Sequence, residues 1–411
     1  MAENTYLIIG GGLAGASAAR TLREEAFDGR VVILAAEDEV PYIRPPLSKE
    51  YLAGKAERSD ALVEGEDWYR EHDVELLRDR RAVALDVAAH EVVLDGGERL
   101  SYAKLLLATG ASPRRLPAAH FGELDGVHYL RTVRDSEALR EALHDGGRRV
   151  VVVGAGWIGL EVAAAARGYG NEVTVLGREG VPLEPVLGPE LGAYFGEVHR
   201  RNGVTLRMGV DVAGFTGRGT ITGVVLGGGE VVPADVVVVG IGAVPNTELA
   251  RAVGLTVDNG IVVDASLRAG NDVWAAGDVA RAFHPVLGKH LRVEHWANAD
   301  RQGPAAARSM LGQHISFDRV PYFYTDQFDL GMEFSGYGDL MDDTRVVYRG
   351  DRESGEFIAF WLAGDRVVAG MNVNVWDVNA GVEKLIATGA PVDEARLVDG
   401  TIALDEVQAR Q

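Results

Sequence analysis

Glycines recur at one spacing in two places along the chain, as Gly10, Gly12 and Gly15 and again as Gly154, Gly156 and Gly159. In such a fingerprint the first glycine permits a tight turn, the second lets the backbone approach a pyrophosphate, and the third lets a helix pack closely on a strand. The N-terminus of the following helix offers free N–H groups and a positive dipole end to the phosphates. Two fingerprints therefore predict two dinucleotide sites.

The glycine spacing needs support from its surroundings. With 52 glycines among 411 residues, this spacing is expected about once by chance, so the flanking elements decide. The first fingerprint follows an apolar strand at Tyr6–Gly10 and opens a helix at Leu13–Glu24, and Val31–Leu34 is the next strand. Glu37 lies just after that strand, where a carboxylate would accept hydrogen bonds from a ribose diol.

The second fingerprint has the same order of strand, helix and strand, at Arg149–Gly154, Ile158–Tyr169 and Glu172–Leu176. An acid ends the second strand at sites that prefer NAD, but here Gly177 and Arg178 follow it. Arg178 could meet the 2′-phosphate of NADPH. Alternatively, Arg178 is a solvated surface residue and Glu179 binds the ribose.

Three further segments carry residues suited to a flavin site. Pro41–Lys49 (PYIRPPLSK) contains adjacent prolines that favour an extended path; it either crosses the flavin with Lys49 near the reactive edge or is a rigid exposed loop. Asp278 follows the apolar strand of Asp272–Asp278 and suits a ribityl or pyrophosphate contact. The helix at Asn298–Leu311, beginning just after Trp296, would stabilise negative charge on a reduced flavin.

Composition excludes several other chemistries. The chain has no cysteine, which rules out a thiol nucleophile, a thiolate metal site and a redox disulfide. Its ten histidines have no metal-ligand spacing, so no metal is expected. A net charge of -20 argues against nucleic acid as a partner. No signal peptide or apolar run of about 18 residues is found, so we expect a cytoplasmic chain that does not bind membranes.

The order of elements predicts an α/β protein with two Rossmann-type nucleotide-binding domains and a small C-terminal α+β domain. From about Pro321 the strands alternate in polarity and no phosphate loop is present, with strands expected at Val346–Arg349, Phe357–Leu362 and Val367–Asn372. Tyr322, Phe323 and Tyr324 are core or interface aromatics, or alternatively shield the flavin.

Taken together, these motifs resemble the oxygenase-coupled NAD(P)H-dependent ferredoxin reductases of the pyridine nucleotide–disulfide oxidoreductase superfamily. The resemblance covers essentially the whole chain. It rests on the two fingerprints, PYIRPPLSK and three further stretches: Ala108–Gly110 (ATG), Gly277–Asp278 (GD) and Glu294–Ala299 (EHWANA).

The resemblance implies a glutathione-reductase-like fold, with a discontinuous FAD-binding domain at 1–112 and 243–320, an NAD(P)-binding domain at 113–242 and a C-terminal interface domain at 321–411. Lys49 and Glu161 would form the catalytic pair near flavin N5. The implied FAD contacts are Ala14, Glu37, Lys49, Val83, Arg131, Asp278 and Trp296. The full implied set for both cofactors adds Gly10, Gly12, Leu13, Gly15, Arg44, Ala108, Thr109, Gly110, Gly154, Gly156, Trp157, Ile158, Gly159, Glu161, Arg178, Gly242, Gly277, His295 and Ala297.

The implied activity is hydride transfer from NADH or NADPH to FAD, followed by transfer of single electrons to a [2Fe–2S] ferredoxin that serves a cytochrome P450 or a dioxygenase. We expect a monomer or a weak homodimer. Because such ferredoxins are acidic, the resemblance also predicts a local basic patch, with candidates Lys289, Arg292, Arg301, Arg308 and Lys384. Alternatives with the same architecture are an NAD(P)H oxidase, a quinone or monodehydroascorbate reductase, and a redox sensor like apoptosis-inducing factor.

Overall fold

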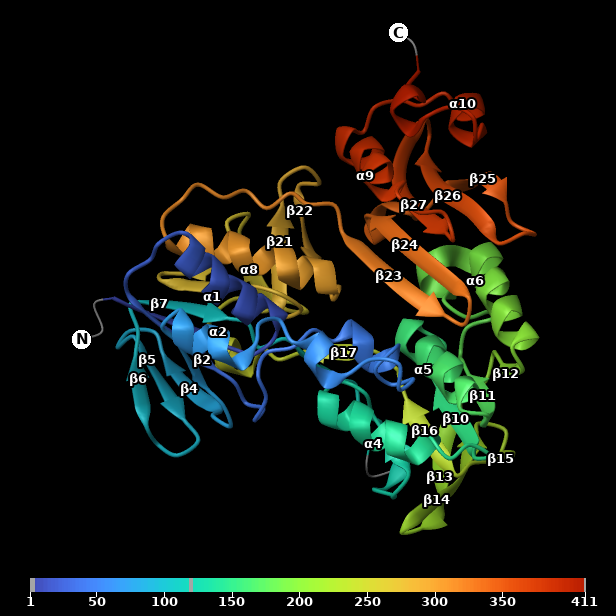
Figure 1. The fold of residues 1–411 in the computed structure, drawn as a ribbon, viewed down its shortest axis with the longest axis horizontal. Helices are drawn as coiled ribbons and strands as arrows, with labels where there is room; N and C mark the ends of the chain where they lie inside the picture. The colour runs from blue at the N-terminus through green and yellow to red at the C-terminus, as the bar shows by residue number, and fades with distance from the viewer. Residues whose placement is uncertain (1–3, 118–120, 410–411) are drawn as a thin grey trace. The chain divides into compact units, whose positions relative to one another are not determined.

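The computed structural model describes residues 4–117 and 121–409, which pack as two compact units (Figure 1). Unit 1 takes the described residues of Met1–Ile43, Arg58–Ser112 and Val244–Pro321, and unit 2 those of Arg44–Glu57, Pro113–Ala243 and Tyr322–Gln411. The segment Arg44–Glu57, which lies inside the expected FAD-binding domain, packs with unit 2. The assignment of three functional domains stays a prediction.

A six-stranded, largely parallel sheet forms the centre of unit 1, in the order β19-β20-β7-β1-β2-β3. Its strands are β19 (Arg268–Gly270), β20 (Val273–Ala275), β7 (Lys104–Leu107), β1 (Thr5–Ile9), β2 (Arg30–Leu34) and β3 (Val74–Leu77). β1 pairs in parallel with β2 and with β7. Every residue of β1 is buried, which explains its unbroken apolar sequence: a parallel strand is covered on both faces.

Helices α1 (Leu13–Glu24) and α8 (Trp296–Met310) lie side by side in unit 1 (Figure 1). Their small residues allow this close approach, because a Cβ atom at Gly303 would lie 2.4 Å from the carbonyl oxygen of Ala14. The smaller elements of unit 1 are η2 (Arg58–Ala61), α2 (Glu66–Glu71), β4 (Ala82–Asp86), β5 (Glu91–Leu94), β6 (Arg99–Ser101), α7 (Glu248–Ala252), β18 (Ile261–Val263), β21 (Ala280–His284) and β22 (Lys289–Arg292).

Unit 2 contains a second parallel sheet, in the order β12-β11-β10-β16-β9. Its strands are β12 (Val204–Arg207), β11 (Glu172–Leu176), β10 (Arg149–Val153), β16 (Val236–Val239) and β9 (Val127–His128). Its helices are α4 (Val133–Leu143), α5 (Trp157–Gly168) and α6 (Glu184–Arg201). The remaining elements before Tyr322 are η1 (Pro45–Ser48), β13 (Val212–Arg218), β14 (Thr220–Leu226) and β15 (Val231–Pro233), while β8 (Ala111–Pro113) and β17 (Ala243–Pro245) span the points where the chain changes unit.

The C-terminal part of unit 2 is an antiparallel sheet in the order β23-β24-β27-β26-β25, with α9 packed against it. Its elements are β23 (Tyr322–Gln327), β24 (Leu330–Gly336), η3 (Gly338–Leu340), β25 (Arg345–Asp351), β26 (Glu356–Ala363), β27 (Arg366–Val373), α9 (Asn379–Thr388), α10 (Glu394–Val398) and η4 (Leu404–Glu406). Two parallel sheets and this α+β part confirm the predicted fold class. Within 4–117 and 121–409, no helix is long and apolar enough to cross a membrane.

Candidate functional site

The first glycine fingerprint is built as its sequence predicts. Gly10 has φ +129°, and a Cβ atom there would lie 2.0 Å from the carbonyl oxygen of Ala108. At Gly15, a Cβ atom would lie 2.2 Å from the carbonyl oxygen of Gly10, so the helix sits directly on the turn. At Gly12, by contrast, no described atom lies within 4 Å of the Cβ position. The backbone is thus crowded inward and open at the position that would face a pyrophosphate.

The second fingerprint repeats this construction. Gly154 has φ +112°, and a Cβ atom there would lie 2.2 Å from the carbonyl oxygen of Gly240. A Cβ atom at Gly159 would lie 2.1 Å from the carbonyl oxygen of Gly154, while Gly156 has no described neighbour within 4 Å. The two glycine triplets therefore have the same three structural roles in different sheets.

Both fingerprints open helices whose first N–H groups are available to an anion. Gly12 caps α1 and Gly156 caps α5, and neither helix receives a side-chain cap from the described residues. No acidic side chain lies in the first turn of either helix. The open backbone, the N–H groups and the positive end of the helix dipole fit the phosphates of FAD and of a nicotinamide dinucleotide.

The residues expected to bind a ribose or its phosphate have different partners in unit 1 and in unit 2. In unit 1 the hydroxyl of Tyr42 donates to Oε2 of Glu37 at 2.5 Å, which holds that carboxylate in place. In unit 2 Arg178 pairs with Asp211 at 2.9 Å, and both side chains are exposed. Asp211 is a contact that sequence reasoning missed, and it leaves Arg178 a solvated residue whose charge is shared with a carboxylate.

The Gly277–Asp278 turn lies against α1 and α8 in unit 1. Gly277 donates its N–H to Oε1 of Gln302 at 2.9 Å, and the Cβ of Ala14 lies 3.1 Å from the Cβ position of Gly277. Helix α8 begins at Trp296, with His295 as its cap, rather than at Asn298, so the expected start was two residues late. Loss of water around the His295 imidazole lowers its pKa to about 4, although the charge of Asp278 opposes this shift, so the ring is neutral at pH 7.

Lys49 and Glu161, the expected catalytic pair, form a buried ion pair in unit 2. Nζ of Lys49 lies 3.0 Å from Oε1 of Glu161, with the side chains 7% and 4% exposed. The hydroxyl of Ser48 donates to Oε2 of Glu161 at 2.5 Å, and that of Thr325 donates to Oε1 at 2.6 Å. The carboxylate therefore accepts three donors, and an ionised carboxylate is an acceptor only.

Aromatic and acidic groups surround the Lys49 ammonium. The Tyr324 ring centroid lies 5.3 Å from Nζ, within cation–π range. Burial, together with the charges of Glu50, Asp326 and Glu161, raises the pKa of Tyr324 to about 12. Burial also raises the pKa of Asp326, although Lys49 opposes this shift. Phe323, the next residue of the aromatic triplet, packs on Trp157 with ring centroids 5.0 Å apart. Whether the triplet shields the flavin stays a prediction.

Sequence reasoning missed Tyr42, Ser48 and Thr325. Ser48 and Tyr42 lie inside the PYIRPPLSK segment, so their place next to Lys49 and near Glu37 was a usable signal. Thr325 is 164 residues from Glu161, and only the fold brings the two together.

The other expected cofactor residues are placed as follows. Arg44 donates to the carbonyl oxygen of Arg131 at 2.5 Å within unit 2, and Thr109 donates to that of Asn246 at 2.7 Å within unit 1. Gly110 and Gly242 have φ of +66° and +103°. Leu13 and Ala297 lie in the first turns of α1 and α8, Ile158 is 44% exposed on α5, and Val83 is 51% exposed on β4. Their roles as cofactor contacts stay predictions.

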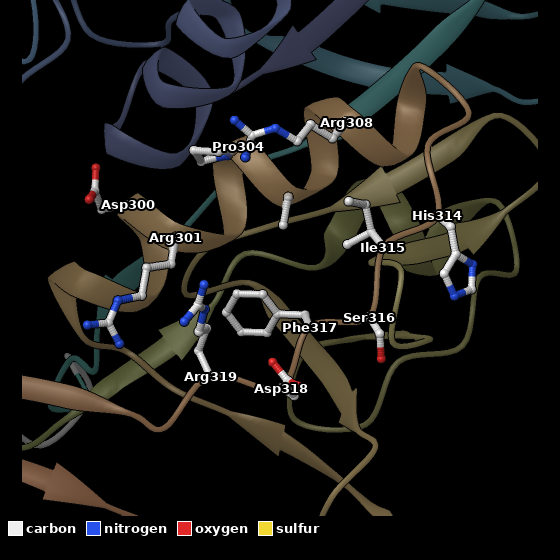
Figure 2. Close-up of a pocket in the computed structure, with 11 residues that line it drawn as sticks. Asp300, Arg301, Pro304, Arg308, His314, Ile315, Ser316, Phe317, Asp318 and Arg319 are labelled. Atoms are coloured by element: carbon white, nitrogen blue, oxygen red, sulfur yellow. The ribbon is translucent and has the colours of Figure 1, made fainter. Parts of the chain in front are cut away.

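Three of the expected basic patch residues already have partners in unit 1. Arg308 pairs with Glu25 at 2.8 Å, Arg292 pairs with Glu294, and Arg301 donates to the carbonyl oxygen of Val320 at 3.1 Å. Arg301 and Arg308 line a surface groove of about 660 Å³ between α8 and the segment of residues 314–319 (Figure 2). Lys384 belongs to α9 of unit 2. Acids also line the groove, so a basic surface stays a prediction.

Residues 4–303 match the family described as pyridine nucleotide-disulphide oxidoreductase. The chain belongs to that family. Residues 322–408 of this pyridine nucleotide-disulphide oxidoreductase also match the family described as Reductase C-terminal. Among 4–117 and 121–409, no group of three or more histidine, aspartate and glutamate side chains could hold a metal ion.

Relatives of this pyridine nucleotide-disulphide oxidoreductase match it from end to end. It is 40% identical to the ferredoxin–NAD(+) reductase component of an anthranilate 1,2-dioxygenase system from Burkholderia cepacia, over 98% of this chain and 99% of the relative. It is 36% identical to putidaredoxin reductase from Pseudomonas putida, over 99% and 97%. The reductase in a solved covalent putidaredoxin reductase–putidaredoxin complex superposes with a TM-score of 0.94 at 35% identity, covering 99% of this chain and 98% of that one. These matches confirm the family resemblance seen in the motifs.

Proposed function

We propose that this chain is an FAD-dependent NAD(P)H:ferredoxin reductase that supplies electrons to a cytochrome P450 or a dioxygenase. The proposal rests on two identically built glycine cradles in a chain without cysteine. The first cradle is formed by Gly10, Gly12 and Gly15, and the second by Gly154, Gly156 and Gly159. Two cradles fit two dinucleotides. Because the chain has no thiol, electrons cannot leave the flavin through a redox disulfide of this chain.

The relatives support the choice of acceptor. The Burkholderia relative is named a ferredoxin–NAD(+) reductase component of a dioxygenase system, and the solved complex pairs a relative with putidaredoxin. Both likenesses extend over nearly the whole length of this chain. A [2Fe–2S] ferredoxin is therefore the proposed partner, in the cytoplasm, where NAD(P)H is supplied.

FAD bound at the first fingerprint would supply the redox chemistry, which is acceptance of a hydride from NAD(P)H and release of single electrons. The residues of this chain bind and orient the two cofactors. Gly12 and the N-terminus of α1 would hold the FAD pyrophosphate, Glu37 would hold a ribose, and Gly156 with α5 would hold the nicotinamide dinucleotide. Lys49, fixed by Glu161, would polarise the N5 region of a bound flavin, and the N-terminus of α8 would favour negative charge on the reduced flavin.

Steady-state reduction of cytochrome c, with and without an added [2Fe–2S] ferredoxin, tests the proposal. We expect strong dependence on ferredoxin and rapid flavin bleaching by NADH or NADPH in a stopped-flow mixer. Fast turnover on a quinone, on monodehydroascorbate or on oxygen alone would instead indicate a small-molecule reductase or an oxidase. Slow turnover with a long-lived charge-transfer band would indicate a redox sensor.

A further inference from the structure

A line of buried hydrogen bonds ends on the Glu161 carboxylate. Nε2 of His199, on α6, lies 2.8 Å from Oε1 of Gln327. Nε2 of Gln327 donates to Oγ1 of Thr325 at 3.1 Å, and that hydroxyl donates to Oε1 of Glu161 at 2.6 Å. Oε1 is the oxygen that also contacts Lys49.

The direction of each hydrogen bond follows from the chemistry of its ends. An ionised carboxylate cannot donate, so the single hydroxyl proton of Thr325 points to Glu161. The hydroxyl oxygen must then accept from the amide of Gln327, whose carbonyl oxygen faces His199. Burial lowers the pKa of His199, so the neutral ring donates from Nε2, and its Nδ1 has no hydrogen-bond partner among the described residues. All three donors therefore point toward Glu161.

Burial gives this line its effect. His199, Gln327 and Thr325 are at most 1% exposed, so their polar groups are shielded from water. In such surroundings a hydrogen bond is stronger than in water, and successive bonds polarise one another. Three apolar side chains of similar shape at these positions could stabilise the fold equally well. The polar line additionally fixes the direction from which a donor reaches Oε1 of Glu161.

We infer that Thr325 is a positioning residue for the redox site, supported by Gln327 and His199. Its hydroxyl holds Oε1 of Glu161 toward Lys49, while Ser48 holds Oε2, so the carboxylate cannot rotate. Without that hydroxyl, the carboxylate turns and Lys49 is drawn toward the neighbouring acids Glu50 and Asp326. Strand β23 of the Reductase C-terminal part thereby sets the position of the ammonium that acts on the flavin. This inference rests on the proposed function.

The test replaces the hydroxyl and then restores it. Thr325→Val has almost the same shape but cannot donate, and Thr325→Ser can. In Thr325→Val we expect flavin reduction by NAD(P)H to slow about tenfold at unchanged KM, the range of a lost charge-assisted hydrogen bond. We also expect the flavin midpoint potential to shift by about 30 mV, which corresponds to a tenfold change in the equilibrium constant of a two-electron couple. Thr325→Ser should stay within about twofold of the parent in rate.

A matched control separates positioning from packing. Ser335 is fully buried on the adjacent strand and donates to Asn379 at 2.8 Å, without a link to Glu161. Ser335→Ala should lower the melting temperature and leave potential and rate unchanged. If Thr325→Val lowered the melting temperature as Ser335→Ala does but kept the parent potential and rate, the hydroxyl would be structural only and the inference would be wrong.

The inference and the proposed function can fail separately. Midpoint potential is measured on the flavin-loaded chain without ferredoxin, so absence of ferredoxin dependence would reject the proposed partner and leave the Thr325 result standing. A crystal structure of Thr325→Val adds a readout without turnover. A Lys49–Glu161 distance still near 3.0 Å would overturn the inference, and a rotated carboxylate would support it.

Discussion

Lys49 and Glu161 contact each other at 3.0 Å, with no more than 7% of either side chain exposed. Enclosing a charge pair costs desolvation energy that the mutual attraction repays only when the remaining polar atoms are also satisfied. Here Ser48 and Thr325 donate to the carboxylate, and the carbonyl oxygen of Pro45 lies 3.4 Å from the ammonium. Pairs of this kind are sensitive to the loss of one member.

Removing one charge of this pair should therefore lower the free energy of unfolding more than removing both charges. Glu161→Gln leaves a buried ammonium without its counter-charge, and Lys49→Met leaves a buried carboxylate. We expect each single variant to lose about 3 kcal/mol of unfolding free energy, and the double variant to recover part of it, in urea titrations. Flavin reduction by NAD(P)H should be slow in all three, because the ammonium is displaced or missing.

Ser335→Ala, which alters a buried hydroxyl elsewhere in the same unit, is the control for general destabilisation. Additive losses in the double variant would show that the two side chains do not act as a pair. Flavin reduction at the parent rate in Lys49→Met would reject its role at the flavin.

The first fingerprint predicts different effects for two of its glycines, one on stability and one on FAD affinity. Gly10→Ala forces a Cβ atom to within 2.0 Å of the Ala108 carbonyl oxygen at φ +129°, so we expect a loss of about 3 kcal/mol in stability or failure to fold. Gly12→Ala meets no described atom within 4 Å, so the chain should fold but bind FAD more weakly. Thermal unfolding and FAD titration of the flavin-stripped chain measure the two effects.

Gly96→Ala, an exposed loop substitution that also meets no described neighbour, is the matched control and should change neither quantity. Equal FAD affinity in Gly12→Ala and Gly96→Ala would mean that the open side of Gly12 does not face the pyrophosphate.

The sequence predicted the parallel parts of the fold closely, and for a physical reason. Helix α1 was expected at Leu13–Glu24 and β11 at Glu172–Leu176, and both have these bounds. Buried parallel strands are short apolar runs, and the glycine turns mark their ends, so the signals are local. Strands β23 and β24 were not predicted, because their aromatic and polar residues face a sheet partner that no local pattern reveals.

The residues of the site also fall into those with a local sequence signal and those without one. Glu37 and the glycines could be named from their spacing together with the strands and helix that flank them. Glu161 could be paired with Lys49 only through family resemblance, since 112 residues separate them. Thr325, Gln327 and His199 meet only when α6 and β23 pack together, and each alone reads as an ordinary core or surface residue.

The nicotinamide preference can be tested at Arg178. Its guanidinium is the cation expected to meet a 2′-phosphate, although Asp211 now pairs with it at 2.9 Å. We expect Arg178→Ala to lower kcat/KM for NADPH about tenfold and to leave NADH nearly unchanged. Asp211→Asn should raise kcat/KM for NADPH, because it frees the guanidinium. Steady-state kinetics with both nucleotides measure these changes.

Arg201→Ala is the matched control, because Arg201 forms a similarly exposed ion pair with Glu197 at 3.1 Å in the same unit. It should affect neither nucleotide. An equal response of NADPH and NADH to Arg178→Ala would show that Arg178 does not read the 2′-phosphate and would favour Glu179 as the ribose contact.

His295 predicts a loss of stability in mild acid. Desolvation lowers its pKa in the folded chain to about 4, whereas an unfolded histidine titrates near 6.5. Above pH 6.5 neither state is protonated, and below it the unfolded chain takes up the proton first, so stability falls as the pH drops from 6.5 toward 4. One such group should cost about 2 kcal/mol between pH 7.5 and pH 5.0. Urea titrations of the flavin-loaded chain at both pH values measure this loss of unfolding free energy. In His295→Gln the loss should be smaller by about this amount, whereas His314→Gln, at an exposed position, should lose as much as the parent. An equal loss in all three chains would mean that His295 is already solvated in the folded protein.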